Sequence, residues 1–138
     1  PEMLVKDLKF IEKLSPEMCG IGPFVPHKDT KFKNENHGDV SLVLMLLSII
    51  RLLKPNILLP ATTALGTVDP LGREKGILHG ANVVMPNLSP VKHRKDYSLY
   101  DNKICTGDEA AQCIGCLADR MKKIGYEIVT DRGNYTEK

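Results

Sequence analysis

Short apolar segments alternate with helical patterns along the first two thirds of this chain, and this alternation constrains the fold more than any other feature. The three apolar segments read as buried strands and cover residues 18–25, 57–61 and 81–85. The helical patterns that precede them cover residues 4–14, 41–54 and 69–79. Alternation of this kind predicts parallel strands joined by crossover helices, which is an α/β fold.

Capping residues mark where these helices begin and end. Asp39 or Ser41 is expected to cap the second helix, because a side-chain oxygen there accepts from a free backbone N–H. Asp69 with Pro70 combines a capping carboxylate with a proline in the first turn, which predicts the start of the third helix. Gly80 suits the position that follows that helix.

The alternation stops after Pro86, and the rest of the chain has a different character. Residues 89–107 are irregular and rich in Lys, His, Arg and Tyr, whereas residues 109–124 predict a last amphipathic helix. We therefore divide the chain into residues 1–88, the strands and helices of a barrel, and residues 89–138, a closing segment with a cysteine-rich helix. The basic run from Lys92 to Lys95 is interpreted as a solvated face.

Composition excludes several classes of function. The net charge is +2 with both signs mixed, so the sequence predicts neither a nucleic-acid partner nor a membrane partner. The longest apolar stretch, residues 42–53, is shorter than the roughly 20 residues that span a bilayer. No secretory signal is recognisable, so we expect a cytoplasmic protein whose cysteines are thiols or metal ligands. The first residue is proline, which suggests a piece of a longer protein.

Polar side chains follow two of the predicted strands. Thr62 and Thr63 come directly after the second strand, and Met85 and Asn87 end the third. In α/β barrels the active site lies at the carboxyl ends of the strands, where hydroxyl and amide groups bind carboxylates, phosphates or other polar ligands. The alternatives are turn and cap chemistry for the threonines and a local Asx turn for Asn87.

Two glycines and two tyrosines are further candidates for the ligand site. Gly20 and Gly22 in the first strand allow a backbone or a ligand to approach closely. Tyr97 and Tyr100 are able to close a cavity with their rings, or simply to cover the end of the barrel.

Three cysteines form a candidate metal site. Cys113 and Cys116 are three residues apart on the last predicted helix, and Cys105 precedes it. Zinc and iron–sulfur clusters both use such spacing, with a fourth ligand from elsewhere or an open position. The alternative is three unligated thiols. Cys19 is a poor candidate because it lies in the first strand.

Taken together, these motifs resemble the HydE family, the radical-SAM maturases of FeFe-hydrogenases, from about residue 4 to residue 133. The motifs that carry the resemblance are Gly20-Ile-Gly-Pro-Phe-Val-Pro-His-Lys-Asp-Thr30, Pro60-Ala-Thr-Thr-Ala-Leu-Gly-Thr67, Gly72-Arg-Glu74, Gly80-Ala-Asn-Val-Val-Met-Pro-Asn87, Tyr97-Ser-Leu-Tyr100, Lys103-Ile-Cys105 and Cys113-x2-Cys116.

The resemblance implies a partial barrel. The family has a TIM-type (β/α)8 barrel whose N-terminal part carries a Cys-x3-Cys-x2-Cys motif. That motif binds a 4Fe-4S cluster, which cleaves S-adenosylmethionine to a 5′-deoxyadenosyl radical. This sequence has no such motif. We therefore expect about three βα units from the C-terminal part of the barrel, with no catalytic residue of their own and no activity alone.

The resemblance also implies a substrate, partners and site residues. The family acts on an iron-bound cysteine complex from a partner maturase while the binuclear iron site is assembled with other maturation proteins. The residues implied to contact the substrate or S-adenosylmethionine are Thr62, Thr63, Met85, Asn87, Tyr97, Leu99, Tyr100, Met18, Gly20 and Gly22. The resemblance implies that the two threonines bind the substrate's anionic group and that Met85 and Asn87 line the cavity. Tyr97, Leu99 and Tyr100 would close the cavity over the adenosyl group. Met18, Gly20 and Gly22 would pack near S-adenosylmethionine.

Cys105, Cys113 and Cys116 match the positions of an accessory iron–sulfur cluster, of 2Fe-2S or 4Fe-4S type, in some family members. Two other interpretations stay open. One is another radical-SAM enzyme of the biotin synthase or methylornithine synthase group. The other is a non-catalytic iron–sulfur or zinc module, which would not need the polar residues at the strand ends.

Overall fold

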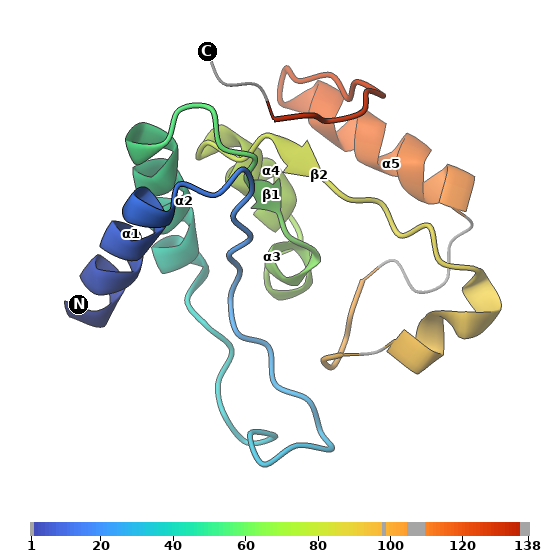
Figure 1. Cartoon of the computed structure of the whole chain (residues 1–138). Helices are drawn as coiled ribbons and strands as arrows, with labels where there is room; N and C mark the ends of the chain where they lie inside the picture. Colours follow the sequence, from blue (N-terminus) through green and yellow to red (C-terminus); the bar gives the residue numbers. More distant parts are fainter. Residues whose placement is uncertain (1, 98, 105–109, 136–138) are drawn as a thin grey trace.

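The computed structural model describes residues 2–97, 99–104 and 110–135. A small parallel sheet lies at its centre, formed by β1 (Pro60–Ala61) and β2 (Val83–Val84) (Figure 1). Pro60 pairs with Val83, and Ala61 pairs with Val84. A parallel bridge between Met18 and Leu58 adds the first segment beside β1. The predicted parallel α/β arrangement is therefore present, although these strands do not close a barrel among the described residues.

The strands are shorter than predicted. Leu58 N donates to Glu17 O at 2.9 Å and Cys19 N donates to Leu58 O at 3.0 Å, but the predicted strand over residues 18–25 is otherwise reduced to its single bridge. Two glycines and Pro23 follow Cys19 in this segment. Glycine weakens a strand and proline lacks the N–H that a ladder needs, which explains the early end of the pairing.

Four α-helices of seven residues or more surround the sheet: α1 (Glu2–Leu14), α2 (Val40–Leu53), α4 (Gly72–Leu78) and α5 (Ala110–Lys123). The prediction for the second helix is confirmed, and Asp39 is its cap, since its carboxylate accepts from Ser41 N at 2.8 Å. The last helix is confirmed as well, and Gly125 follows it with a φ of 84°. None of the helices in the described part of the chain has the length and apolar character that a membrane crossing requires.

The third helix differs from the prediction. A separate helix, α3 (Thr63–Val68), begins directly after Thr62, and α4 begins at Gly72 rather than at Asp69. Asp69 instead accepts from Leu71 N at 2.9 Å and from Lys75 Nζ at 2.6 Å. Its carboxylate therefore stabilises the turn between two short helices. Gly80 follows α4 with a φ of 102°, as its predicted position requires.

The core lies between one face of the sheet and the helices. Its most buried side chains come from α2, β1 with the residues before it, α3 and α5, and they are Leu47, Ile50, Ile57, Leu59, Leu65 and Met121. Because side chains alternate along a strand, Leu58 and its partner Met18 point to the opposite face of the sheet. Met18 is 48% exposed and Met85 is 50% exposed, so no helix of the described residues fully covers that face.

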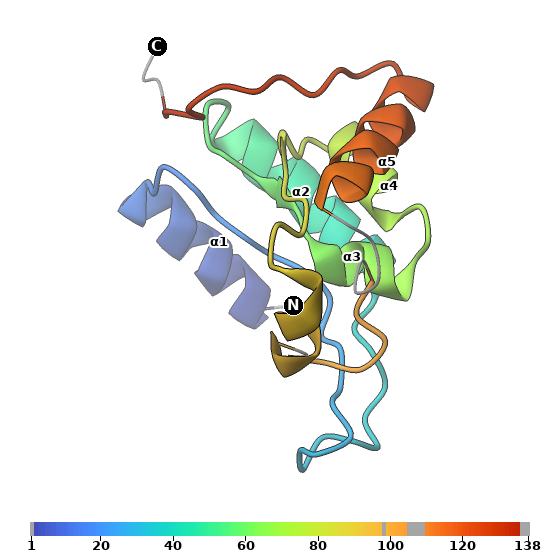
Figure 2. The ribbon, with the colours of Figure 1, turned by 90° about the vertical axis from the view of Figure 1, so that its right-hand side faces the viewer.

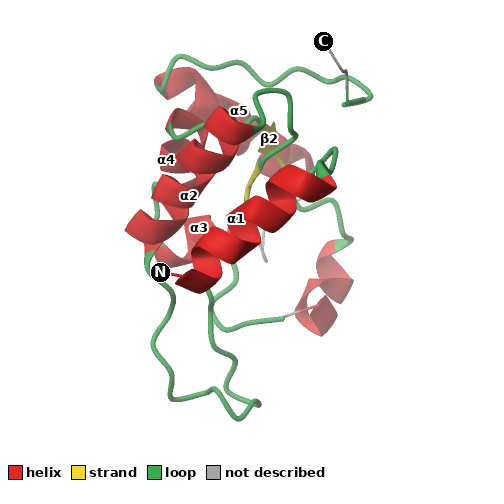
Figure 3. Cartoon of the chain, turned by 60° about the vertical axis from the view of Figure 1, so that its left-hand side comes forward, coloured by secondary structure: helices red, strands yellow, loops and turns green. Residues whose placement is uncertain are grey.

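The segment after β2 is more ordered than predicted. It contains a 3-10 helix, η1 (Val91–Tyr97), where the sequence predicted an irregular chain. Arg94 is only 2% exposed, so the interpretation of the basic run as a solvated face is wrong at this position. Residues 27–38 form a loop that projects away from the helices (Figure 3). Its base is closed by Gly38 N, which donates to Phe24 O at 2.8 Å.

Candidate functional site

The carboxyl ends of the strands point toward one end of the molecule. In Figure 1 α3 lies below β1, the chain leaving residues 18–25 runs down beside it, and the chain after β2 runs toward the lower right to η1. Gly22 and Thr62 are in direct contact there, because a Cβ atom on Gly22 would lie 2.7 Å from Thr62 Oγ1. The atom that approaches Gly22 is thus a side-chain hydroxyl, that of Thr62, rather than the backbone or ligand that the sequence predicted.

Thr62 also caps α3. Its side-chain oxygen accepts from Leu65 N at 3.4 Å, which is the cap chemistry that the sequence left open as an alternative. A threonine hydroxyl has one donor and two acceptor sites, so capping leaves its proton available for a ligand. Thr63 is the first residue of α3, and both threonines are partly exposed.

Asn87 forms the local turn that the sequence offered as its alternative. Its side-chain oxygen accepts from Ser89 N at 3.2 Å. Its backbone carbonyl accepts from Arg94 at 3.1 Å, and Arg94 Nε donates to Ser89 O at 2.8 Å. The buried guanidinium of Arg94 therefore fixes the chain directly after β2, a role that sequence reasoning missed because a run of four basic residues has no periodicity.

Met18 and Met85 lie at a different location from the contact of Gly22 with Thr62. They line an apolar cavity of about 550 Å³ together with Leu58, Val83, Tyr126 and Ile128. The last two residues belong to the chain after α5, to which sequence reasoning assigned no role. The structure thus divides the predicted ligand residues between this cavity and the contact of Gly22 with Thr62.

The predicted closing residues differ in exposure. Tyr97 is 62% exposed and Leu99 is 79% exposed, whereas Tyr100 is partly buried. Lys103 Nζ donates to the carbonyl of Tyr97 at 3.2 Å, so Tyr97 is held through its backbone while its ring extends into solvent.

The cysteines offer only part of the predicted metal site. Cys113 is 3% exposed and Cys116 is exposed, one turn later on α5, and both are free thiols. Cys105 lies outside the described residues. Within the described ranges no group of three His, Cys, Asp or Glu side chains is placed to hold a metal ion. Burial raises the pKa of the Cys19 thiol, which disfavours the thiolate that metals bind and agrees with its exclusion.

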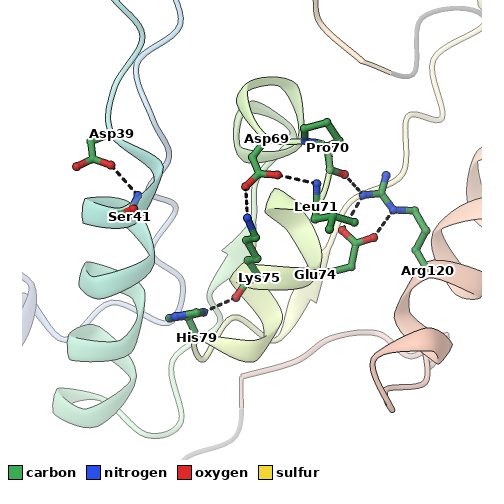
Figure 4. A network of polar contacts seen from close by, with 9 residues as sticks. All are labelled: Asp39, Ser41, Asp69, Pro70, Leu71, Glu74, Lys75, His79 and Arg120. Carbon is green, nitrogen blue, oxygen red and sulfur yellow. Dashed lines mark hydrogen bonds and ion pairs between the residues drawn. The ribbon is translucent and has the colours of Figure 1, made fainter.

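A strong charged contact joins α4 to α5, away from the strand ends (Figure 4). Arg120 Nε donates to Glu74 Oε1 at 2.5 Å, and its second nitrogen donates to Glu74 Oε2 at 2.6 Å and to Pro70 O. Burial raises the pKa of Glu74, but hydrogen bonds from Arg120 and the backbone and the charges of Arg120 and Arg73 outweigh it, so the pKa is below its usual value. Glu74 is therefore an ionised structural group.

Comparison with known proteins identifies relatives. The [FeFe] hydrogenase maturase subunit HydE of Thermotoga maritima is 43% identical over 130 residues, which cover 94% of this chain and 37% of that protein. The 3-methylornithine synthase of Methanosarcina acetivorans is 25% identical over 91% of this chain and 35% of its own length. No protein-family model matches. The chain thus spans about a third of the length of these relatives, and the predicted resemblance to HydE is confirmed.

Proposed function

Because the chain is homologous to HydE, we propose that it forms the substrate-facing C-terminal part of a radical-SAM maturase that helps to assemble the binuclear iron site of FeFe-hydrogenase. The similarity to HydE across almost the whole chain is the observation that carries this proposal. The substrate is an iron-bound cysteine-type complex delivered by a partner maturase. The geometry of Gly20, Gly22 and Thr62 supports a ligand site at the carboxyl ends of the strands.

Gly20 supports a ligand beside the first apolar segment. Gly20 and Gly22 follow the single bridge of Met18 with Leu58, beyond which this segment is not paired as a strand. A Cβ atom on Gly20 would meet no atom within 4 Å, so packing in the described structure does not require a glycine there. A ligand that approaches the backbone would require one. S-adenosylmethionine bound beside Gly20 and Met18 would explain why a glycine occupies position 20.

The radical chemistry would come from groups outside this sequence. A 4Fe-4S cluster, when bound by the remaining part of the enzyme, supplies the electron that cleaves S-adenosylmethionine. The residues of this chain bind and orient: Thr62 and Thr63 donate hydrogen bonds to the anionic group of the substrate, and Asn87 lines its cavity. Both threonines adjoin the strand end, where a substrate carboxylate would reach them.

A chimeric enzyme tests this function. We expect HydE of Thermotoga maritima in which the 130 matched residues are replaced by those of this chain to mature hydrogenase. Changing Thr62 and Thr63 to valine should lower maturation at least about tenfold, since each lost hydrogen bond to a charged group costs roughly 1.5–3 kcal/mol. Cleavage of S-adenosylmethionine should change much less. Both activities are measured in the same preparation.

Two control variants separate binding from folding. Thr62→Ser retains the hydroxyl and the cap, so it should retain maturation, and Thr130→Val alters an exposed threonine far along the chain. Equal loss of cleavage and maturation in the double valine variant would contradict a substrate role. A chimera that cleaves S-adenosylmethionine but never matures hydrogenase would instead favour a substrate like that of the 3-methylornithine synthase group.

The accessory cluster has its own test. We propose that Cys105, Cys113 and Cys116 bind an iron–sulfur cluster. Anaerobic reconstitution of the chain with iron and sulfide should give a visible chromophore that is lost when all three cysteines are changed to serine. Cys19→Ser is the matched control and should keep the chromophore, because Cys19 lies in the first segment with a raised thiol pKa. The same absorbance in the triple variant would exclude the site.

A further inference from the structure

Residues 99–104, which we call the strap, connect two parts of the chain at the carboxyl ends of the strands. At the first anchor Asp101 N donates to Pro26 O at 3.1 Å, while Lys28 N donates to Asp101 Oδ2 at 2.9 Å. These two bonds run in opposite directions, and the bond between Lys28 and Asp101 joins residues 73 positions apart. Figure 2 shows the strap, in orange, beside the chain that leaves the first segment.

The second anchor is at α3. Ile104 N donates to Thr67 Oγ1 at 3.4 Å. The side chain of Ile104 lies against Gly66, where a Cβ atom would be 2.8 Å from Ile104 Cδ1. Since α3 starts directly after Thr62, this anchor ties the strap to the strand end that carries the candidate threonines.

Between the anchors the backbone turns sharply. Asn102 has a φ of 56°, a left-handed conformation that its short polar side chain tolerates. Tyr100 is partly buried directly before the first anchor, and Leu99 before it is 79% exposed. The strap is thus fixed by polar bonds at Asp101 and Ile104, while Leu99 and Tyr100 extend from the fixed part.

We propose that Asp101 is a positioning residue, which holds the strap across the ends of the first segment and β1 and so places Tyr100 at the ligand site. The placement of Tyr100 at a ligand rests on the proposed function, whereas the fixing of the strap by Asp101 does not. The carboxylate suits it because one side chain accepts from the amide of Lys28 while its own backbone donates to Pro26.

Hydrogen exchange of the full chain tests the anchor. In Asp101→Ala the amide of Lys28 should exchange about tenfold faster, the effect of losing a hydrogen bond to a charged group. Exchange should also rise within residues 99–104. Asp101→Asn keeps an accepting oxygen and should restore most of the protection. Asp96→Ala removes a carboxylate of η1 that pairs with His93, so it should leave Lys28 unchanged.

Kinetics of the chimeric enzyme test the role. We expect Asp101→Ala to raise the KM for S-adenosylmethionine about tenfold with a smaller change in kcat, and Asp101→Asn to rescue it. Unchanged exchange at Lys28, or an unchanged KM, would overturn the proposal. If the unmodified chimera is inactive, the proposed function fails, and exchange at Lys28 still decides whether Asp101 fixes the strap.

Discussion

Replacing Gly72 with alanine is expected to destabilise the chain by about 3 kcal/mol, which is a large part of the stability of a small domain. A Cβ atom on Gly72 would lie 2.2 Å from Leu65 O and 2.5 Å from its carbonyl carbon. These atoms belong to the backbone of α3, so no side-chain rotation relieves the clash. The two helices would have to separate, which opens the core around Leu65.

Gly115→Ala is the matched control for this change. Gly115 also lies in a helix, but a Cβ atom on it would meet nothing within 4 Å. Alanine there should stabilise the chain by roughly 0.5–1 kcal/mol through its helix propensity. Urea unfolding of both variants and the unmodified chain measures the difference. If Gly72→Ala unfolds at the same urea concentration as the unmodified chain, the packing of α4 against α3 described above is wrong.

The clash at Gly72 also explains one of the motifs that carry the resemblance to HydE. Gly72-Arg-Glu74 contributes a glycine that permits close helix packing and a glutamate that pairs with α5. Both roles are structural.

Patterns that repeat over several turns were predictable from the sequence. The helices α1, α2 and α5 have such patterns, and the parallel pairing of β1 with β2 follows from their alternation with apolar segments. The six-residue helix α3 was not predictable, because one and a half turns hold no periodicity. Its stability comes from tertiary contacts, such as those of Gly66 with Ile104, which no local pattern records.

The candidate site was predictable only in part, for a similar reason. The position of Thr62 directly after β1 was predictable, but its contact with Gly22 lies beyond the single bridge that remains of the first predicted strand. The burial of Arg94 depends instead on the carbonyls of Asn87 and Ser89, which its own sequence neighbours do not reveal. The cavity beside Met18 and Met85 is formed in part by the chain after α5. The position of that chain depends on the packing of Ile128 against the core, which the sequence does not show.

Among the ion pairs described above, that of Glu74 with Arg120 is expected to contribute most to stability. Glu74 is 7% exposed and receives two hydrogen bonds from one guanidinium. Arg120→Ala leaves this carboxylate buried without its main partner, and removal of one member of a buried pair costs about 3 kcal/mol. Glu74→Gln should cost less, since a neutral amide pays a smaller desolvation penalty. The free energy of unfolding at pH 7 measures both.

Lys75→Ala provides the control on the same helix. Lys75 pairs with Asp69 at 2.6 Å, but its side chain is 45% exposed, so this pair should contribute less than about 1 kcal/mol. Equal effects of Arg120→Ala and Lys75→Ala would contradict the structural importance of the contact between α4 and α5.

The pH dependence of stability gives an independent measure of the same pair. The pKa of Glu74 in the folded chain is lower than its usual value, so the unfolded chain binds the proton more readily. The stabilisation is therefore complete above the unfolded pKa of about 4.3 and is lost as the pH falls through the lower, folded value. We expect the unmodified chain to lose more stability than Glu74→Gln when the pH falls from about 5 to about 3. Parallel pH profiles of the two proteins would mean that Glu74 does not keep its charge through the contact with Arg120.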